Sequence, residues 1–387
     1  MPTKKSRHGL DPIRLKHLKS TIEDDVRRGR YYGAVILVAR DGAIGLHEAI
    51  GFIEPDKKPP IKKNSVFSLF STTKAFTSVL TMRAIELGQF ALTTRVAEII
   101  PEFRGGQREQ INFFHLLTHS SGLPSIFSPR EGMYIDRLDE IIAAICENVH
   151  CAAAPGKVIN YSPLAGHALM GEAVRRADPR KRSYRQIVED ELFKPLKMKD
   201  SSIGVRKDLK PRKIVPIFID PFPVQHPGHS NLGPNGAFEE EHAEMPWVGA
   251  VSTVADMFRF TEMLRRGGEL DGARILSPAM LELATQNWTG DKPNELYKIL
   301  TAPRGWAPYP AYQGLGFQVR GEQIVHNLFG TLTSPRTFGN YGAGSSVFWA
   351  DPVSKVSFVC LSAGVMNGVD NIERFQRLSD IAASAAI

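Results

Sequence analysis

Apolar residues near the start of the chain recur every three or four positions. Asp11-Pro12 is followed by Leu15, Leu18, Ile22 and Val26. This spacing predicts a helix with one buried face. Aspartate before proline is typical of a helix start, because the carboxylate can accept hydrogen bonds from the first free backbone amides. We therefore expect an amphipathic helix that begins at this proline.

A continuous apolar run over residues 34–39 comes next and predicts a buried strand. The run ends in Arg40-Asp41-Gly42, and an aspartate-glycine pair between two apolar runs is typical of a tight hairpin turn. The chain then returns through residues 43–50 as a second strand. The chain is thus expected to open with a helix and two strands.

The last part of the chain also predicts strands and then a helix. Two of these strands are separated by an aspartate-proline turn, and the final apolar residues recur with helical spacing. The strands are expected at residues 316–319, 346–350 and 356–361, and the helix face carries Ile372, Phe375, Leu378 and Ile381.

These elements predict an α+β fold, in which an antiparallel sheet is flanked by helices and carries an inserted, mostly helical lobe. Residues 1–84 and 313–387 are expected to form the sheet lobe, and residues 85–312 the inserted lobe. A site should lie between the lobes. Two long loops rich in proline, glycine and aromatic residues, 211–247 and 288–312, are expected to form its walls.

Composition narrows the class of protein. Of 387 residues, 42% are hydrophobic and 23% are charged, which is ordinary for a globular protein. The net charge of +7 is spread over short basic groups without a nucleic-acid-binding signature, so we expect no nucleic-acid partner. The basic start of the chain lacks an apolar leader segment, and no run reaches transmembrane length. We therefore expect a cytoplasmic protein without a membrane partner, in which the three cysteines are reduced.

Ser71-Thr72-Thr73-Lys74 is the first candidate for chemistry. Residues three apart lie on one face of a helix, so the Lys74 amine can reach the Ser71 hydroxyl and act as its base. Taken alone, the pair is also compatible with an ordinary helix start. Tyr161, after the turn Pro155-Gly156, and the segment 339–344, which leads into an apolar strand, make the chemical interpretation the stronger one.

In this order the motifs resemble those of the serine β-lactamase-like superfamily, which includes class C β-lactamases, D-alanyl-D-alanine peptidases, family VIII carboxylesterases and related acyltransferases. Three further segments are similar to family segments, namely residues 111–124, 195–201 and 249–257. The resemblance implies that Ser71 is the nucleophile, Lys74 the base and Tyr161 the residue that relays a proton to the leaving group. It also implies an oxyanion hole made by the backbone amides of Ser71 and Ala343.

The chain departs from the family at two positions that contact substrate. Pro163 replaces the asparagine of the Tyr-x-Asn motif, and proline has no side-chain hydrogen bond to offer. Asn340 replaces the lysine or histidine of the third motif, so the cation that would meet a β-lactam carboxylate is missing. Both changes argue against β-lactam recognition. The expected substrate-binding residues are Asn340, Tyr341, Gly342, Pro163, Trp247 and Trp306.

We therefore expect a serine hydrolase that works through a Ser71 acyl-enzyme, foremost a carboxylesterase on small or medium acyl esters. An amide hydrolase or an acyltransferase is the first alternative, and a non-catalytic binding protein with the same fold is the second. We expect no cofactor and no metal, because the His115 and His119 pair lacks the glutamate of the metalloprotease motif. The partner is expected to be a small ester or amide, while the sequence leaves the oligomeric state open.

Overall fold

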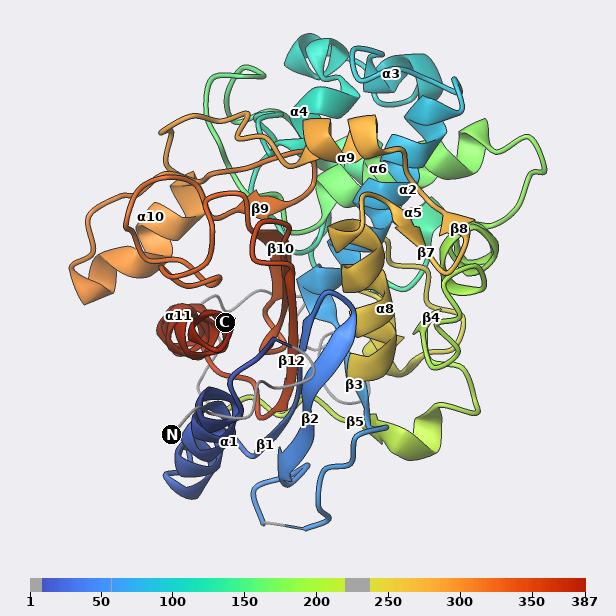
Figure 1. Ribbon diagram of the computed structural model, residues 1–387. Helices are drawn as coiled ribbons and strands as arrows, with labels where there is room; N and C mark the ends of the chain where they lie inside the picture. Colours follow the sequence, from blue (N-terminus) through green and yellow to red (C-terminus); the bar gives the residue numbers. More distant parts are fainter. Residues whose placement is uncertain (1–8, 57, 220–236) are drawn as a thin grey trace.

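The computed structural model describes residues 9–56, 58–219 and 237–387, and its centre is a six-stranded sheet (Figure 1). The strand order is β2-β1-β12-β11-β10-β9, and every neighbouring pair is antiparallel. The expected α+β fold is confirmed. The strands are β1 (Gly33–Arg40), β2 (Ala43–Gly51), β9 (Gln318–Val319), β10 (Phe338–Gly342), β11 (Ser346–Asp351) and β12 (Val356–Ala363).

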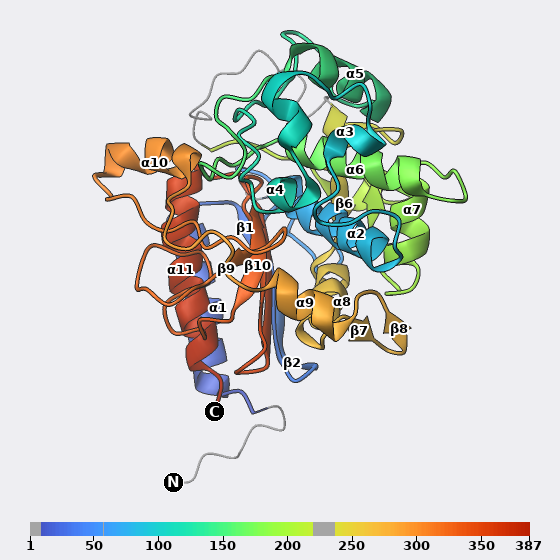
Figure 2. The same ribbon diagram turned by 90° about the horizontal axis from the view of Figure 1, so that it is seen from above.

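Side chains of the central strands alternate between two cores, as the period of a β-strand requires. Val35 and Leu37 of β1 join the core on one face, whereas Ala34 and Ile36 join the core on the other. Helices α1 (Pro12–Arg27) and α11 (Gly368–Ser384) cover the second face, and α8 (Val254–Arg265) covers the first (Figures 1 and 2). The sheet is therefore buried on both sides.

The predicted start of α1 is confirmed in detail. Asp11 caps the helix by accepting a hydrogen bond from the Ile13 amide at 2.8 Å, and Pro12 occupies the first helical position. Leu15, Leu18 and Ile22 are buried against the sheet and α11, as the apolar spacing predicts.

The segment between β2 and β9 is mainly helical and also carries two small sheets. A four-stranded sheet has the order β4-β6-β3-β5, and β7 pairs with β8. The elements are β3 (Val66–Ser68), η1 (Phe70–Thr73), α2 (Lys74–Glu86), α3 (Val96–Ile99), η2 (Gly106–Gln110), α4 (Phe113–Leu117), α5 (Leu138–Asn148), α6 (Ala165–Ala177), α7 (Tyr184–Val188), η3 (Glu189–Phe193), β4 (Ser202–Ile203), η4 (Lys210–Arg212), β5 (Lys213–Ile214), η6 (Ala237–Glu239), β6 (Ala250–Ser252), β7 (Glu269–Leu270), β8 (Ala273–Arg274), α9 (Pro278–Ala284), α10 (Glu295–Thr301) and η7 (Ala302–Arg304).

One helix of this segment packs on the large sheet as well as on α2, where Phe260 lies 4.7 Å from Phe76 between ring centroids. Helix α8 contacts β1, β11 and β12, and Phe260 packs edge-on against Phe348 with ring centroids 5.6 Å apart. The division of the chain into a sheet lobe and an inserted lobe, at residues 84/85 and 312/313, remains a prediction.

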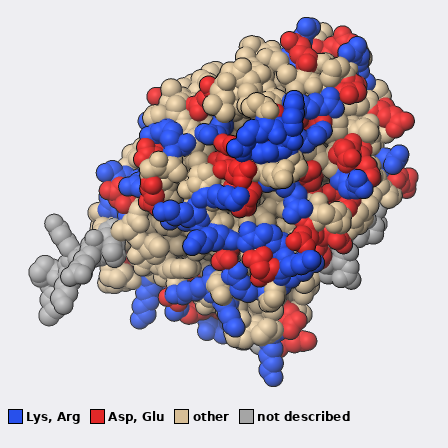
Figure 3. Space-filling model, turned by 90° about the vertical axis from the view of Figure 1, so that its right-hand side faces the viewer, with Lys and Arg blue, Asp and Glu red and all other residues tan. Residues whose placement is uncertain are grey.

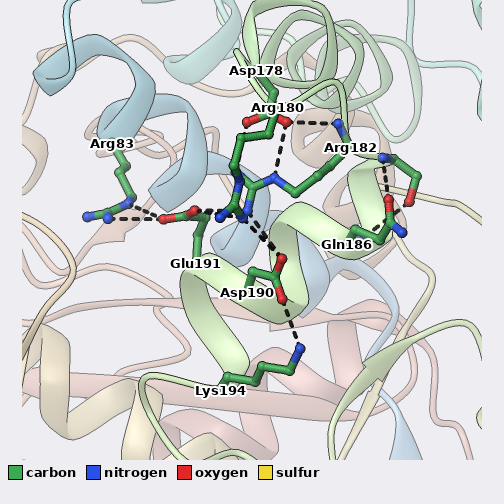
Figure 4. Close-up of polar contacts among 9 residues, drawn as sticks. Arg83, Asp178, Arg180, Arg182, Gln186, Asp190, Glu191 and Lys194 are labelled. Atoms are coloured by element: carbon green, nitrogen blue, oxygen red, sulfur yellow. Dashed lines mark hydrogen bonds and ion pairs between the residues drawn. The ribbon is translucent and has the colours of Figure 1, made fainter.

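A network of ion pairs fixes the outer end of α2 to the α7–η3 helical segment (Figure 4). Arg83 of α2 donates to Glu191 of η3, and Arg182 bridges Asp178 to Asp190 and Glu191. Each acidic group in this network faces at least one guanidinium. The negative charges of the cluster are therefore compensated by its own arginines, and the ion pairs stabilise the packing of these helices.

One face of the molecule also carries a mixture of charges. On the face shown in Figure 3, Lys and Arg side chains lie interspersed with Asp and Glu rather than in one basic field. None of the helices in the described residues is both long and apolar enough to cross a bilayer.

Candidate active site

Ser71 lies in the 3₁₀ turn η1, directly before α2. The residue before it, Phe70, has a φ of 50°, an uncommon backbone conformation for a residue with a side chain. Gly344 makes room for the Phe70 ring, because a Cβ at position 344 would lie 2.2 Å from the Phe70 ring carbon Cδ2. The backbone around Ser71 is thus shaped by contact with the turn after β10.

Lys74 is the first residue of α2, and its side chain is buried beneath Ser71. Its Nζ lies 3.2 Å from Ser71 Oγ, 2.7 Å from the carbonyl oxygen of Pro163 and 2.9 Å from that of Trp247. No carboxylate of the described residues pairs with it. Burial therefore lowers the pKa of Lys74 well below its ordinary value.

The three hydrogen-bond partners around Lys74 Nζ suit a neutral amine. A neutral lysine has two N–H donors and one lone pair. The carbonyl oxygens of Pro163 and Trp247 can accept both donors, which leaves the lone pair for the Ser71 hydroxyl. Lys74 is thus arranged to accept the proton of Ser71.

Tyr161 approaches Ser71 from another side. Its hydroxyl donates to Ser71 Oγ at 2.7 Å, and the Lys74 Nζ lies 5.2 Å from the centre of its ring. Burial, together with the nearby Tyr297, raises the pKa of Tyr161 above its ordinary value. Tyr161 therefore stays protonated and can act as a proton donor.

The start of β11, directly after the turn that follows β10, is joined by hydrogen bonds to η1 and to the residue before η1. Ser346 Oγ donates to the Leu69 carbonyl at 2.9 Å and lies 2.9 Å from Thr72 Oγ1. Gly342 fits against the same atoms, since a Cβ there would lie 2.3 Å from the Leu69 oxygen. These contacts hold Ala343 and Ser71 on one side of a common cavity.

The site cavity has a volume of about 360 Å³ and combines apolar walls with neutral polar groups. Arg304 is the charged residue that lines it besides Lys74, and Arg304 already pairs with Asp370 and Glu373. Among the described residues, the lining thus offers no unpaired arginine for a substrate anion. The apolar lining residues are Phe127, Leu296, Leu300, Pro303, Ala311, Met366 and Val369, and the amides are Asn294, Gln313, Gln318, Asn340 and Asn367.

Most of the residues expected at the site meet here. Ser71, Lys74, Tyr161, Tyr341 and Ala343 all line the cavity, as does Asn340. The Asn340 side chain donates to the Gly316 carbonyl at 3.1 Å, so its amide group is partly engaged by the protein.

Four expected substrate-binding residues are not among the described residues that line the cavity. Pro163 and Trp247 are buried and contribute the carbonyl oxygens that face Lys74. Gly342 supports the packing of β10 on η1, and Trp306 stacks on His326 with ring centroids 3.5 Å apart. Part of the expected cleft wall, residues 220–236, lies outside the described residues.

Two histidines lie at the site that the sequence did not place there. His119 and His167 line the cavity, and the His119 ring centre lies 4.9 Å from that of Tyr161. Burial and the nearby Lys74 lower the pKa of His119 to about 3. Its Nδ1 accepts a hydrogen bond from the Ser162 amide at 3.3 Å, so the neutral ring carries its proton on Nε2.

His115 and His119 do not share a helix face, as a metal site formed by both would have used. Helix α4 ends at Leu117, and His119 follows it with a φ of 53°. His115 Nδ1 instead accepts a hydrogen bond from the Asn112 amide at 3.3 Å. Within the described ranges, no group of three or more potential ligands could hold a metal ion.

Comparison with known proteins gives one family across nearly the whole chain. The family model described as "Beta-lactamase" matches residues 18–383. Among curated proteins, Penicillin-binding protein 4 of Amycolatopsis lactamdurans is 29% identical over 285 residues, which are 72% of this chain and 71% of that protein. Protein flp of Staphylococcus aureus (strain MW2) is 29% identical over 193 residues, 48% of this chain. That match spans only 38% of the length of Protein flp.

Solved structures show the same fold. A penicillin-binding protein homolog from Caulobacter crescentus superimposes with a TM-score of 0.80 at 23% identity, covering 97% of this chain and 98% of that one. A family VIII carboxylesterase superimposes with a TM-score of 0.78 at 20% identity, covering 96% and 97%.

Proposed function

The chain belongs to the beta-lactamase family, and on that premise we propose that it is a serine hydrolase that forms an acyl-enzyme on Ser71. Its foremost substrates are carboxylic esters with small or medium neutral acyl groups. The observation that carries the proposal is the placement of Lys74 Nζ and the Tyr161 hydroxyl at 3.2 Å and 2.7 Å from Ser71 Oγ, inside one cavity. A nucleophile needs a base within hydrogen-bond reach, and this arrangement supplies one.

Acylation begins when Lys74 takes the Ser71 proton and Oγ attacks the ester carbonyl. Negative charge then develops on the carbonyl oxygen, and the backbone amides of Ser71 and Ala343 are assigned to receive it. Tyr161 gives its proton to the departing alkoxide, and protonated Lys74 restores the proton on Tyr161. Water then attacks the acyl-enzyme and gives a proton to the Lys74 and Tyr161 pair, and this pair passes a proton to Ser71 Oγ as the carboxylic acid leaves.

Ester substrates are favoured over β-lactams by the charges around the cavity. A β-lactam carries a carboxylate, which needs a cation at the site. Asn340 is neutral, and Arg304 is already held by Asp370 and Glu373. The apolar side chains of the lining suit an uncharged acyl group instead.

Acyl transfer is the second candidate. The segment 294–304 contributes Leu296, Leu300 and Pro303 to the lining and shields the cavity with apolar groups. Where water is excluded, an alcohol or amine can intercept the acyl-enzyme in its place.

The test is the intact mass of the protein after mixing with p-nitrophenyl esters of graded acyl length and, separately, with nitrocefin. We expect wild type to release nitrophenol and to gain the mass of the acyl group, and Ser71→Ala to do neither. Nitrocefin should remain intact. Adding an alcohol and analysing the products separates transfer from hydrolysis.

Two results would contradict the proposal. Adducts that persist in Ser71→Ala would place the nucleophile elsewhere. The absence of turnover and of adduct with every ester would instead favour a non-catalytic binding protein, whose ligand affinity should survive the Ser71→Ala change.

A further inference from the structure

Side chains of helix α11 contact the turn that carries Ala343, on the residues before and after it. Asn371 lies near the start of this helix and is fully buried. Its Nδ2 lies 3.1 Å from the Tyr341 hydroxyl and 3.1 Å from Ser345 Oγ. Tyr341 comes two residues before Ala343, and Ser345 comes two residues after it. One side chain therefore contacts both sides of the residue whose amide is assigned to the oxyanion hole.

The turn needs such support because its backbone is strained. Ser345 has a φ of 60°, which is unfavourable for a residue with a side chain. Its Oγ accepts a hydrogen bond from the Met366 amide at 2.9 Å, and Asn371 Nδ2 also donates to the Met366 carbonyl at 3.0 Å. Arg374, one turn further along α11, reaches the Ser345 carbonyl at 3.4 Å. The contacts with Asn371 and Arg374 thus oppose relaxation of the strained backbone.

Asn371 itself does not touch the space where a substrate would lie. It is not among the described residues that line the site cavity, and its side chain is inaccessible. Any effect of Asn371 on the reaction must therefore pass through the residues it contacts, which are Tyr341 and Ser345 on either side of Ala343, and Met366.

We infer that Asn371 is a positioning residue for the oxyanion hole; this inference rests on the proposed function. An oxyanion donor stabilises charge that exists only in the transition state, so its position affects the rate more than the binding of substrate. A misplacement of about 1 Å can cost about 100-fold in rate. Leu296, Leu300 and Pro303, which supply apolar contacts of the cavity, lie outside this turn, so substrate binding should change less than the rate.

The decisive variant is Asn371→Leu, which keeps a similar shape and removes the donors. For a p-nitrophenyl ester that wild type hydrolyses, we expect kcat to fall by about 10- to 100-fold while KM stays within about twofold. Phenylboronic acid is the second probe, because Ser71 Oγ adds to boron and gives a tetrahedral adduct. Its Kd should rise by about the same factor as kcat falls.

The matched control is Ser379→Ala on the same helix. Ser379 is also fully buried, accepts a hydrogen bond from Trp349 Nε1 at 2.9 Å and donates to the Leu328 carbonyl at 2.9 Å. This change removes buried hydrogen bonds away from the turn. We expect it to lower the free energy of unfolding and to leave kcat and the boronic acid Kd unchanged.

An Asn371→Leu protein that is less stable yet keeps wild-type kcat and boronic acid affinity would overturn the inference. If that variant does not fold, Ser345→Ala removes one contact of Asn371 at a buried residue that is not among the described residues lining the cavity. A boronic acid Kd raised by about threefold or more would support the inference, and an unchanged Kd would overturn it. Failure of the proposed function would appear in wild type itself, as the absence of turnover and of adduct. Failure of the inference about Asn371 would appear only in the variants, so the two failures are distinguishable.

Discussion

Lys74 occupies a position that penalises its charged form. Its Nζ is surrounded by a hydroxyl and two carbonyl oxygens, and no acidic group of the described residues compensates a positive charge. Burial then lowers the pKa of the amine. The same burial that favours the neutral form of Lys74 also costs stability, because the folded chain holds this proton less tightly than the unfolded chain does.

This difference predicts how stability depends on pH. Between the lowered pKa of the folded state and the ordinary value of 10.5, the unfolded state binds one more proton at Lys74. Stability therefore rises with pH in this window, by about 1.4 kcal/mol per pH unit from this group. Lys74→Met should lose that contribution to the slope. Urea unfolding of both proteins from about pH 8 to pH 10 measures the slope.

Lys355 provides the control, since its side chain is 58% exposed. Lys355→Met should keep the wild-type slope. Equal slopes in wild type and Lys74→Met would show that Lys74 stays charged in the folded protein, and would remove the base from the proposed mechanism.

Individual site residues differed in how far the sequence could place them. Ser71, Lys74 and Tyr161 lie together because their motifs occupy fixed positions on helix and turn. Trp247 and Trp306 were expected in the cleft wall because aromatic loop residues often line sites. Composition does not say where a side chain points, and in the structure both indoles pack away from the cavity. His119 was assessed only as a metal ligand, because its closeness to Tyr161 depends on tertiary folding.

Helix α10 forms one wall of the site cavity and projects from the body of the molecule (Figure 2). Leu296 and Leu300 line the cavity, whereas Ile299 of the same helix is 71% exposed. Arg304, just after the helix, fixes the segment to α11 through Asp370 and Glu373. The inner face of α10 therefore limits the size of the group that the cavity can hold, which in the proposed function is the acyl group.

Shortening Leu300 should enlarge the cavity and shift the preferred acyl chain to greater length. For Leu300→Ala we expect kcat/KM to rise for the longest p-nitrophenyl esters relative to the shortest by about 10-fold, since one or two buried methylene groups contribute about this much. Ile299→Ala is the matched control on the outer face, and its profile should equal that of wild type. If kcat/KM depends on acyl length in the same way for Leu300→Ala and Ile299→Ala, the acyl group lies elsewhere in the cavity.

Long, strongly patterned elements were predictable from the sequence, and short ones were not. Helices α1 and α11 and strands β1, β2, β11 and β12 appear close to the expected ranges, because each has a sustained apolar pattern. Strand β10 was not predicted as a strand, since Gly339, Asn340 and Gly342 are poor strand formers. It forms because β11 and β9 pair with it on either side. The expected strand 316–319 is only Gln318–Val319, since the chain turns at Gly316 with a φ of 76°.

The sheet and the helical segment share one hydrophobic core. A single cluster of buried residues joins Leu37 and Leu361 of the sheet to Phe76 of α2, Ile141 of α5 and Phe260 of α8. Neither part can expose its share of this core without exposing the other. We therefore expect one cooperative unfolding transition rather than two.

Thermal unfolding followed by far-UV circular dichroism, tryptophan fluorescence and residual esterase activity tests this expectation. The three transitions should coincide. Separate transitions, or a stable fragment after limited proteolysis near residues 84 or 313, would show that the two predicted lobes are independent domains.

The pairing of β1 with β12 also governs when a newly made chain can become active. Val356 at the start of β12 lies opposite Arg40 at the end of β1. The ribosome must add about 300 residues between them, which takes on the order of 15–60 s at ordinary elongation rates. During that time β1 can pair with β2 but not with β12, so one edge of an apolar strand stays unpaired in the nascent chain. Translation that stops before β12 should thus yield an inert product even though Ser71, Lys74 and Tyr161 are already in place along the chain.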